Sequence, residues 1–259
     1  MILLPPSEGK TDAAGKKKLD LAQLSYPELN PRRKELLTAL IALANGPKAK
    51  ARSVLKISAK QDFEIARDQV LLTAPAGPAW TVYTGVLYDA IGVDSLSAPA
   101  LKKLESQTFV VSALFGLISV ADQIPAYRFS GDSVLPKIGS LTKFWGTSIT
   151  ELITKADEFV IDLRSGTYVN LGQTSVEISD QVVVPRIMQK MPTGKPKVVS
   201  HSIKATKGRL VRAMVQSKKS INSVELIADL AASLGADVEV KSPSKPGQPW
   251  GIDIIVEVL

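Results

Sequence analysis

Several basic side chains that could bind anions lie close together in residues 204–212, which read Lys-Ala-Thr-Lys-Gly-Arg-Leu-Val-Arg. The surrounding pattern predicts a strand over 197–203 and a helix over 207–217, so the segment would open a helix. Helix N-termini present unpaired backbone N–H groups that bind phosphate and carboxylate, and glycine lets an anion approach closely. The alternative is an ordinary surface helix with solvated arginines. The candidate phosphate-binding residues here are Lys204, Lys207, Gly208, Arg209 and Arg212.

A second candidate, Lys10, lies in the loop Ser-Glu-Gly-Lys-Thr, which follows an apolar strand predicted over 1–4. The loop lacks the Gly-x4-Gly-Lys-Ser/Thr spacing of a phosphate-binding loop, so the sequence does not predict a P-loop NTPase. Lys10 can still make a single contact to a phosphate, or it is an ordinary loop lysine.

Polar residues also follow a second strand, predicted over 159–163. Strand ends are the positions at which open α/β sheets bind ligands. Ser165 and Tyr168 come directly after this strand, so they could hydrogen-bond an oxyanion. The alternative is a local Asx or Ser turn formed by residues 162–165.

Arg128 comes after the most apolar segment of the chain, residues 109–119, for which we expect a central strand running into a turn. Together with Tyr127 it could bind a phosphate or stack against a base. The alternative is a structural ion pair between Arg128 and an aspartate such as Asp122.

The residue types available for catalysis are restricted. The chain contains no cysteine, which excludes disulfides, thiolate zinc sites, cysteine-ligated iron–sulfur clusters and thiol redox catalysis, and favours an intracellular protein. The single histidine, His201, is expected in the middle of a strand and in a structural role. The sequence contains no carboxylate pair or metal-ligand spacing that stands out, so we expect no metal and no cofactor.

The basic charge is concentrated in two stretches. The chain has 32 Lys and Arg against 25 Asp and Glu, a net charge of +7, and residues 181–224 contain ten basic residues without one acidic residue. A second acid-free stretch, 47–61, carries Lys48, Arg52, Lys56 and Lys60. Segregation of this kind favours an anionic partner, such as nucleic acid or a nucleotide, over a plain basic face.

The elements that must position these residues alternate between helices and strands, which predicts an α/β or mixed α+β fold in a single domain over 1–259. We expect helices over 31–44, 48–70 (one or two, with Ser58 as a possible N-cap), 141–156 and 222–234, the last capped by Asn222. Further strands are expected over 182–185 and, as an antiparallel pair, over 238–240 and 252–258. No apolar run is long enough for a membrane span, and residues 1–4 are too short for a secretion signal.

Taken together, the motifs resemble one family, the YaaA peroxide-stress proteins. The matching stretches occur in family order and extend over nearly the whole chain: Lys10-Thr11, 82–85, 112–128, 144–146, 162–168 and 204–209. The resemblance implies a cytoplasmic bacterial protein that limits peroxide damage by lowering free iron. It also implies a mixed α/β fold with a basic cleft, and double-stranded DNA binding through a helix–hairpin–helix-like element near 48–70.

Two functions from different classes follow. In the first, the protein binds duplex DNA through phosphate contacts of its basic residues, with little reading of base sequence. In the second, it is an enzyme for a small anionic or nucleotide-like substrate. Its candidate catalytic residues are then Lys10, Tyr83, Asp122, Ser165 and Tyr168. A long basic groove would favour DNA, whereas a closed pocket with converging polar groups would favour catalysis.

Overall fold

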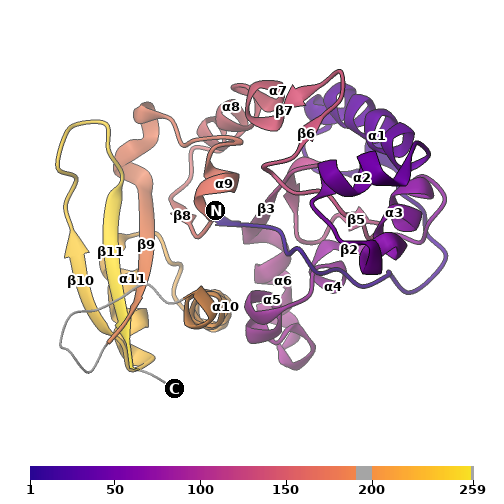
Figure 1. Ribbon diagram of the computed structural model, residues 1–259. Helices are drawn as coiled ribbons and strands as arrows, with labels where there is room; N and C mark the ends of the chain where they lie inside the picture. Colours follow the sequence, from indigo (N-terminus) through magenta and orange to yellow (C-terminus); the bar gives the residue numbers. More distant parts are fainter. Residues whose placement is uncertain (191–199, 258–259) are drawn as a thin grey trace.

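A seven-stranded mixed sheet forms the centre of the computed structural model, which describes residues 1–190 and 200–257, without the side chains of 200–202 (Figure 1). The strand order is β10-β11-β9-β8-β1-β3-β4. Pairing is antiparallel for β3–β4 and β10–β11 and parallel for the other neighbours. The strands are β1 (Ile2–Leu4), β3 (Thr108–Ser112), β4 (Gly116–Ser119), β8 (Val160–Asp162), β9 (Val182–Gln189), β10 (Asp237–Lys241) and β11 (Trp250–Val256). The predicted mixed α/β class is confirmed.

The short strand β1 lies in the interior of the sheet, between β8 and β3. Its three apolar residues are buried, which suits a parallel strand covered on both faces, and Pro5 follows where the strand ends. β1 pairs with β3 on one side and with β8 on the other. The chain segments that leave β1 and β8 therefore diverge at one edge of the sheet, the usual place for a ligand in open α/β folds.

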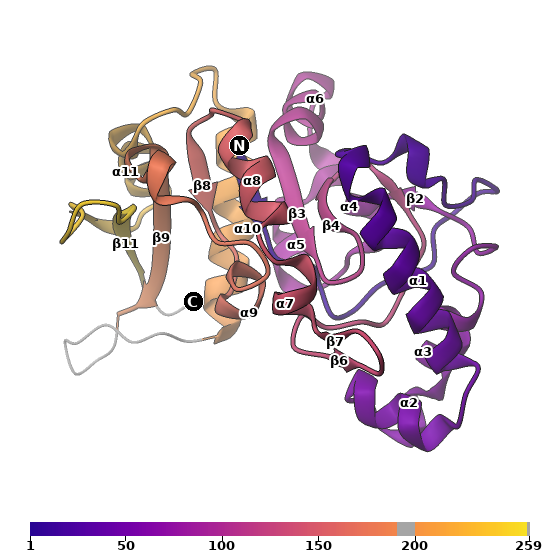
Figure 2. The same cartoon turned by 90° about the horizontal axis from the view of Figure 1, so that it is seen from above.

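Helices α1 (Asn30–Ala44), α2 (Lys48–Leu55) and α3 (Asp62–Gln69) gather at one end of the molecule (Figure 2). The first half of the chain also forms α4 (Ala79–Val82) and, nearer the middle of the molecule, α5 (Val86–Ile91) and α6 (Ala98–Gln107). The predicted helix over 31–44 is confirmed, and the predicted 48–70 region consists of two short helices. The turn between α2 and α3 carries the expected cap, because Ser58 and Gln61 form a reciprocal capping box.

A buried arginine connects α1 to the sheet. The guanidinium of Arg33 donates hydrogen bonds to the carbonyls of Ser25, Phe115 and Leu117 and to the side chain of Asn30, at 2.8–2.9 Å. Arg33 is fully buried, and burial lowers its pKa to about 10. It therefore satisfies backbone carbonyls of the β3–β4 turn that water cannot reach.

The second half of the chain adds α7 (Leu141–Trp145), α8 (Ser148–Lys155), α9 (Gly166–Val169), α10 (Ser200–Gln216) and α11 (Val224–Ser233). Helix α8 packs against β4, while α10 and α11 pack against β9 and β11. Short two-stranded sheets are formed by β2 (Gly77–Pro78) with β5 (Gln123–Ile124) and by β6 (Val134–Leu135) with β7 (Gly139–Ser140). The antiparallel pair predicted near the C-terminal end of the chain is confirmed as β10 and β11.

The strand predicted over 197–203 is wrong where the structure describes it. Residues 197–199 lie outside the described residues, and α10 begins at Ser200, so His201 belongs to a helix and not to a strand. The helical spacing explains the difference. Ile203 packs on the core, and the buried Leu210 and Met214 follow it seven and eleven residues later on the same face.

Glycines mark a change of chain direction in two of the predicted segments. The strand and turn expected over 109–119 are the β3 strand and the turn into β4, and Gly116 adopts a φ of 65° directly after that turn. The helix expected over 141–156 is two helices, since α7 ends at Gly146 with a φ of 53°. Positive φ is accessible to glycine at little cost, so the chain changes direction at these positions.

Candidate functional site

A pocket of about 650 Å³ lies at the edge of the sheet where β1 and β8 end. One wall is the loop that follows β1, and the opposite wall is the segment that follows β8 together with the first turns of α10. The lining residues that carry polar side chains are Ser7, Glu8, Thr84, Tyr88, Ser130, Asp132, Ser165, Thr167, Tyr168, Lys204 and Lys207. The loop that follows β1 and the segment that follows β8, which the sequence singles out separately, thus line the same pocket.

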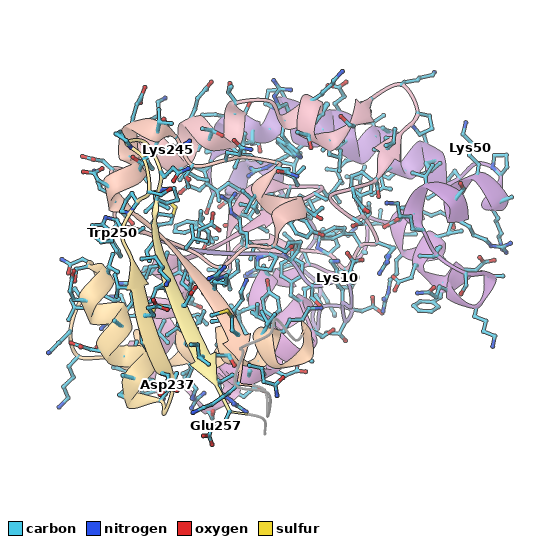
Figure 3. All side chains as sticks on the ribbon, turned by 60° about the vertical axis from the view of Figure 1, so that its left-hand side comes forward. Lys10, Lys50, Asp237, Lys245, Trp250 and Glu257 are labelled. Atoms are coloured by element: carbon cyan, nitrogen blue, oxygen red, sulfur yellow. The ribbon has the colours of Figure 1, made fainter. Side chains whose placement is uncertain are left out.

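Lys10 lies directly behind this wall, in the interior of the molecule (Figure 3). Its Nζ donates a 2.7 Å hydrogen bond to the carbonyl of Ser7 and lies 4.1 Å from the ring centroid of Tyr127 and 5.4 Å from that of Tyr83. Only 8% of Lys10 is exposed, and burial lowers its pKa to about 8. The ammonium thus fixes the pocket loop through Ser7 and contacts two aromatic faces.

A chain of hydrogen-bonded hydroxyl groups leads from the surroundings of Lys10 into the core. The Tyr83 hydroxyl is 3.0 Å from that of Tyr127, which is 2.8 Å from Ser112 Oγ. Ser112 Oγ in turn accepts hydrogen bonds from the backbone N–H groups of Leu114 and Phe115. Burial raises the pKa of both tyrosines, so they remain protonated donors in a hydrogen-bonded chain.

A buried carboxyl group, Asp68 of α3, completes the polar region beside Lys10. Its Oδ1 accepts a 2.9 Å hydrogen bond from the backbone N–H of Arg128, while Oδ2 has no partner among the described residues. Burial raises the pKa of Asp68 to about 8. The guanidinium of Arg128 forms an ion pair of 2.9 Å with Glu8 in the pocket wall, so the predicted anion contact at Arg128 is already occupied by a carboxylate.

The segment 204–212 does not open a helix as expected, because α10 begins at Ser200. Gly208 packs where α10 crosses α5, and a Cβ at this position would lie 2.2 Å from the carbonyl oxygen of Leu87. Arg212 donates two 2.8 Å hydrogen bonds to the carbonyls at the end of α5. These two residues therefore hold α10 against α5, and the prediction of a helix N-terminus at 204–208 is wrong.

The two lysines of α10 that line the pocket differ in environment. Lys207 Nζ donates to the carbonyls of Leu163, at 2.6 Å, and Arg164, at 3.4 Å, and burial lowers its pKa. It therefore supplies a hydrogen-bond donor to the backbone carbonyls directly after β8. Lys204 is exposed on the pocket wall and forms no hydrogen bond or ion pair with any described side chain or backbone group.

The residues after β8 have mixed roles. The carboxylate of Asp162 binds the guanidinium of Arg164 through two hydrogen bonds of 2.7 and 2.8 Å and also accepts from the Arg164 backbone N–H. This is the Asx turn that the sequence offers as an alternative. Ser165 and Tyr168 line the pocket, and burial raises the pKa of Tyr168 to about 12.

Asp122 does not join the other candidate catalytic residues. It accepts hydrogen bonds from the backbone N–H and hydroxyl of Ser25 and from the backbone N–H of Ser119, at 2.9–3.1 Å. The structure gives it a structural role in this turn, and it is not part of the pocket lining.

The basic residues of 47–61 also lie away from the pocket, with one exception. Lys48 and Arg52 share the carboxylate of Asp62, at 3.7 and 2.6 Å. Lys56 pairs with Asp132, whose side chain lines the pocket, so Lys56 lies at its rim. Lys60 is exposed and has no acidic partner in the described part of the chain.

Arg209, a further predicted phosphate contact, also lies away from the pocket. It lies on another side of α10, where it lines a small cavity beside α11.

Sequence reasoning missed Asp68 and Glu8, although both face charged candidates. Glu8 lies in the same loop as Lys10, where only the lysine is a predicted anion contact, and Asp68 lies in a helix whose sequence is rich in charged residues. In residues 1–190 and 200–257 no group of three His, Cys, Asp or Glu residues could hold a metal ion. The same residues include no helix that is long and apolar enough to span a bilayer.

Fold and site together define a mixed α/β protein with a polar pocket at the switch point of its sheet. The family model described as "Peroxide stress protein YaaA" matches residues 1–234, and the chain belongs to this family. The resemblance found in the motifs is thereby confirmed, and a stress-related role follows from it.

The most similar relatives include three proteins described as UPF0246 proteins. One from Streptomyces coelicolor is 38% identical over 258 residues, covering 99% of this chain and 98% of the relative. One from Corynebacterium efficiens is 40% identical, with 95% and 97% covered, and one from Corynebacterium glutamicum is 42% identical, with 92% and 94% covered. The similarity thus extends through the C-terminal strands.

Proposed function

We propose that this peroxide-stress protein binds a small anionic, nucleotide-like ligand in the pocket at the ends of β1 and β8. The observation that carries the proposal is the position of Lys204, an exposed ammonium on the pocket wall that no described carboxylate neutralises. A phosphate placed there gains a charge-assisted hydrogen bond without displacing an existing ion pair.

The remaining lining suits the rest of such a ligand. Glu8 and Asp132 present carboxylates, which accept hydrogen bonds from the N–H groups of a base. Pro6 and Leu87 supply apolar contact surface, and the hydroxyl of Thr167 can serve as donor or acceptor for a sugar. A volume of about 650 Å³ is within the range of small-molecule sites.

Lys10 acts on this site through the loop that it holds. Because its Nζ is bonded to Ser7 O behind the wall, Lys10 is a positioning residue for the loop that carries Glu8. If the protein is an enzyme, Ser165 and Tyr168 are the predicted catalytic candidates that line the pocket itself, and their hydroxyls would act on the bound ligand.

The test is a titration of AMP, ADP and ATP by calorimetry, with thermal unfolding measured in parallel. Lys204→Ala should weaken nucleotide binding about tenfold or more, because it removes one charge-assisted hydrogen bond. Lys218→Ala is the matched control, since Lys218 is an exposed lysine that follows the end of α10 at Gln216 and does not line the pocket. Equal nucleotide affinity in Lys204→Ala and the unmodified protein would contradict the proposal, as would no nucleotide binding at all.

Duplex DNA is a second candidate ligand, favoured by the two-helix element of α2 and α3. The family resemblance assigns DNA binding to this region, and α2 with the following turn contains no acidic residue. Lys50 and Lys60 are exposed there, and neither has an acidic partner among the described residues. These two lysines would contact phosphates directly, whereas Lys48 and Arg52 would first have to leave Asp62.

Fluorescence anisotropy with a labelled duplex at several salt concentrations tests this second candidate. Replacement of Lys50 and Lys60 by glutamate should reduce the slope of log K against log salt by about 2, one phosphate contact each. The control is Lys218→Glu, which alters the net charge away from this element. An unchanged slope in the double variant would exclude DNA binding through α2 and α3 and leave the nucleotide proposal untouched.

A further inference from the structure

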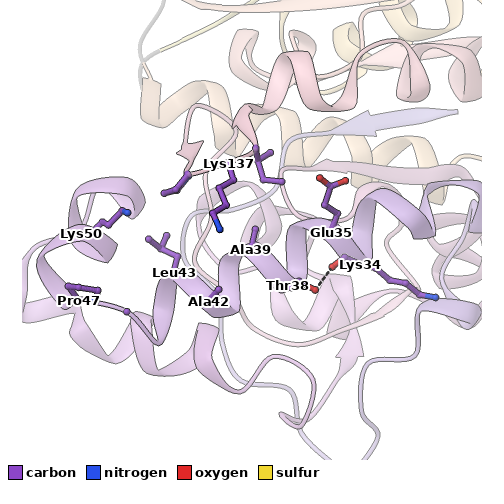
Figure 4. Close-up of a pocket in the computed structure, with 12 residues that line it drawn as sticks. Lys34, Glu35, Thr38, Ala39, Ala42, Leu43, Pro47, Lys50 and Lys137 are labelled. Atoms are coloured by element: carbon purple, nitrogen blue, oxygen red, sulfur yellow. Dashed lines mark hydrogen bonds between the residues drawn. The ribbon is translucent and has the colours of Figure 1, made fainter.

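A second concave site, separate from the pocket, lies between α1, the start of α2 and the β6–β7 hairpin (Figure 4). Its volume is about 590 Å³, and it shares no lining residue with the pocket at the strand ends. We call it the α1 groove. It is lined by Lys34, Glu35, Thr38, Ala39, Ala42, Leu43, Gly46, Pro47, Lys50, Pro136, Lys137 and Ile138.

The floor of the α1 groove is apolar, because α1 presents alanines and a leucine there. Ala39 and Ala42 are three residues apart and face the hairpin, with Leu43 beside them. Pro47 closes one end, and Ile138 covers the floor from the hairpin side. An apolar body can therefore be buried along α1 without displacing a large side chain.

The turn that covers the α1 groove has an unusual residue. The N–H of Ile138 donates to the carbonyl of Leu135, which closes a turn over Pro136 and Lys137. Lys137 has a φ of 70°, a conformation for which such turns ordinarily use glycine or asparagine. Here the consequence is that the Lys137 side chain extends across the groove (Figure 4).

The charges around the α1 groove favour an anion. Lys50 lies at one end of the groove and Lys137 reaches over its middle, and neither ammonium group forms an ion pair or hydrogen bond with another described residue. Glu35 is the one acidic residue in the lining, and it lies at the other end, near Lys34. Two unpaired ammonium groups thus flank an apolar floor, a combination that matches a carboxylate attached to a hydrocarbon body.

We propose that the α1 groove binds an apolar carboxylate of medium chain length. The hydrocarbon body lies along Ala39, Ala42 and Leu43, and the carboxylate lies between Lys50 and Lys137. This site is independent of the nucleotide proposal, because it uses different residues and a different ligand chemistry. A nucleotide would leave its polar sugar and base against an apolar floor, which costs hydrogen bonds.

Titration with sodium decanoate below its micelle concentration tests the proposal, with 1-decanol as the uncharged analogue. Binding should be one to one, should shift the backbone amide resonances of residues 38–43 and 136–138, and should be about tenfold tighter for decanoate than for decanol. Ala42→Phe fills the floor and should abolish binding. Lys218→Ala is the matched lysine control and should bind decanoate normally.

Lys137→Gly separates binding from folding. Glycine relieves the positive φ and keeps the turn, so this variant should be at least as stable as the unmodified protein and yet bind decanoate about tenfold more weakly. Equal affinities for decanoate and decanol would overturn the proposal, as would undiminished binding in Ala42→Phe. Concentration-dependent dimers that Ala42→Phe disrupts would also overturn it, because a second copy of the chain would then be the occupant.

Discussion

Replacement of Lys10 by methionine should stabilise the protein, although Lys10 is a candidate functional residue. The ammonium is almost completely removed from water, and its single hydrogen bond to Ser7 O does not replace full hydration. Methionine has a similar length, packs well against aromatic rings such as those of Tyr83 and Tyr127, and carries no charge. The substitution therefore removes the cost of burying the charge and keeps the packing.

The size of the effect follows from the pKa of Lys10, which is lowered from 10.5 to about 8. Each pKa unit corresponds to about 1.4 kcal/mol, so the buried ammonium costs the fold about 3 kcal/mol at neutral pH. Between pH 8 and 10.5 the folded chain releases the proton before the unfolded chain does. The unfolded state then binds more protons, and the stability of the unmodified protein rises with pH in this window.

Urea unfolding at pH 7, 8, 9 and 10 measures the difference in unfolding free energy between Lys10→Met and the unmodified protein. The difference should be about 3 kcal/mol at pH 7, roughly 5 °C in Tm for a chain of this length, and should approach zero toward pH 10.5. The exposed Lys218→Met is the control and should show no pH-dependent difference. A difference that stays constant with pH, or a less stable Lys10→Met at every pH, would refute the reasoning.

Three further substitutions have defined structural consequences for stability, each measurable by urea or thermal unfolding. Gly208→Ala should destabilise the protein by about 2 kcal/mol or more, because its Cβ collides with α5, whereas Gly166→Ala meets no atom within 4 Å and should be close to neutral. Arg33→Met should cost about 3–5 kcal/mol, since it leaves three buried carbonyls without donors. Asp162→Asn should cost a similar amount, about 3–5 kcal/mol, by breaking the buried pair with Arg164, and high salt should not rescue it.

Elements with a strong local pattern could be predicted from the sequence. The final hairpin of β10 and β11 consists of two runs rich in β-branched residues about a Pro- and Gly-rich loop, and α11 has a polar cap and a closing glycine. Even in α11 the observed N-cap lies one residue after the predicted N-cap. Ser223 accepts the hydrogen bond from the Leu226 N–H, where Asn222 was expected, because both residues are good caps and only the backbone geometry selects one.

The start of α10 could not be predicted in the same way. A short apolar run flanked by polar residues fits a strand and a buried helix turn equally well, and arbitration requires knowing what packs on it. The contact that decides is tertiary: Gly208 of α10 fits against Leu87 and Ala90 of α5, 118–121 residues earlier in the chain. A glycine that looks suited to an anion is in fact required by helix packing.

The candidate site was predicted in part, because strand ends are local features and charge partners are not. Lys10 follows β1, and Ser165 and Tyr168 follow β8, which is the adjacent parallel strand. The carboxyl ends of parallel strands lie at the same edge of a sheet, so the strand assignments alone predict that these residues lie near one another. Asp68 escaped notice because its burial depends on α3 packing beside Arg128, and nothing in its own helix distinguishes it from a surface carboxylate.

Stretches of sequence without acidic residues do not produce a surface without acidic residues. Carboxylates from other parts of the chain pair with five of their cations: Asp62 with Lys48 and Arg52, Asp132 with Lys56, Asp253 with Arg186, and Asp237 with Lys190. An anion that binds at these cations must displace a carboxylate and gains little net energy. Anion binding should therefore concentrate at the described lysines that remain unpaired, of which Lys204 faces the strand-end pocket, Lys50 and Lys137 face the α1 groove, and Lys60 faces solvent. The local arrangement of carboxylates, more than the net charge of +7, determines which anions this protein can bind.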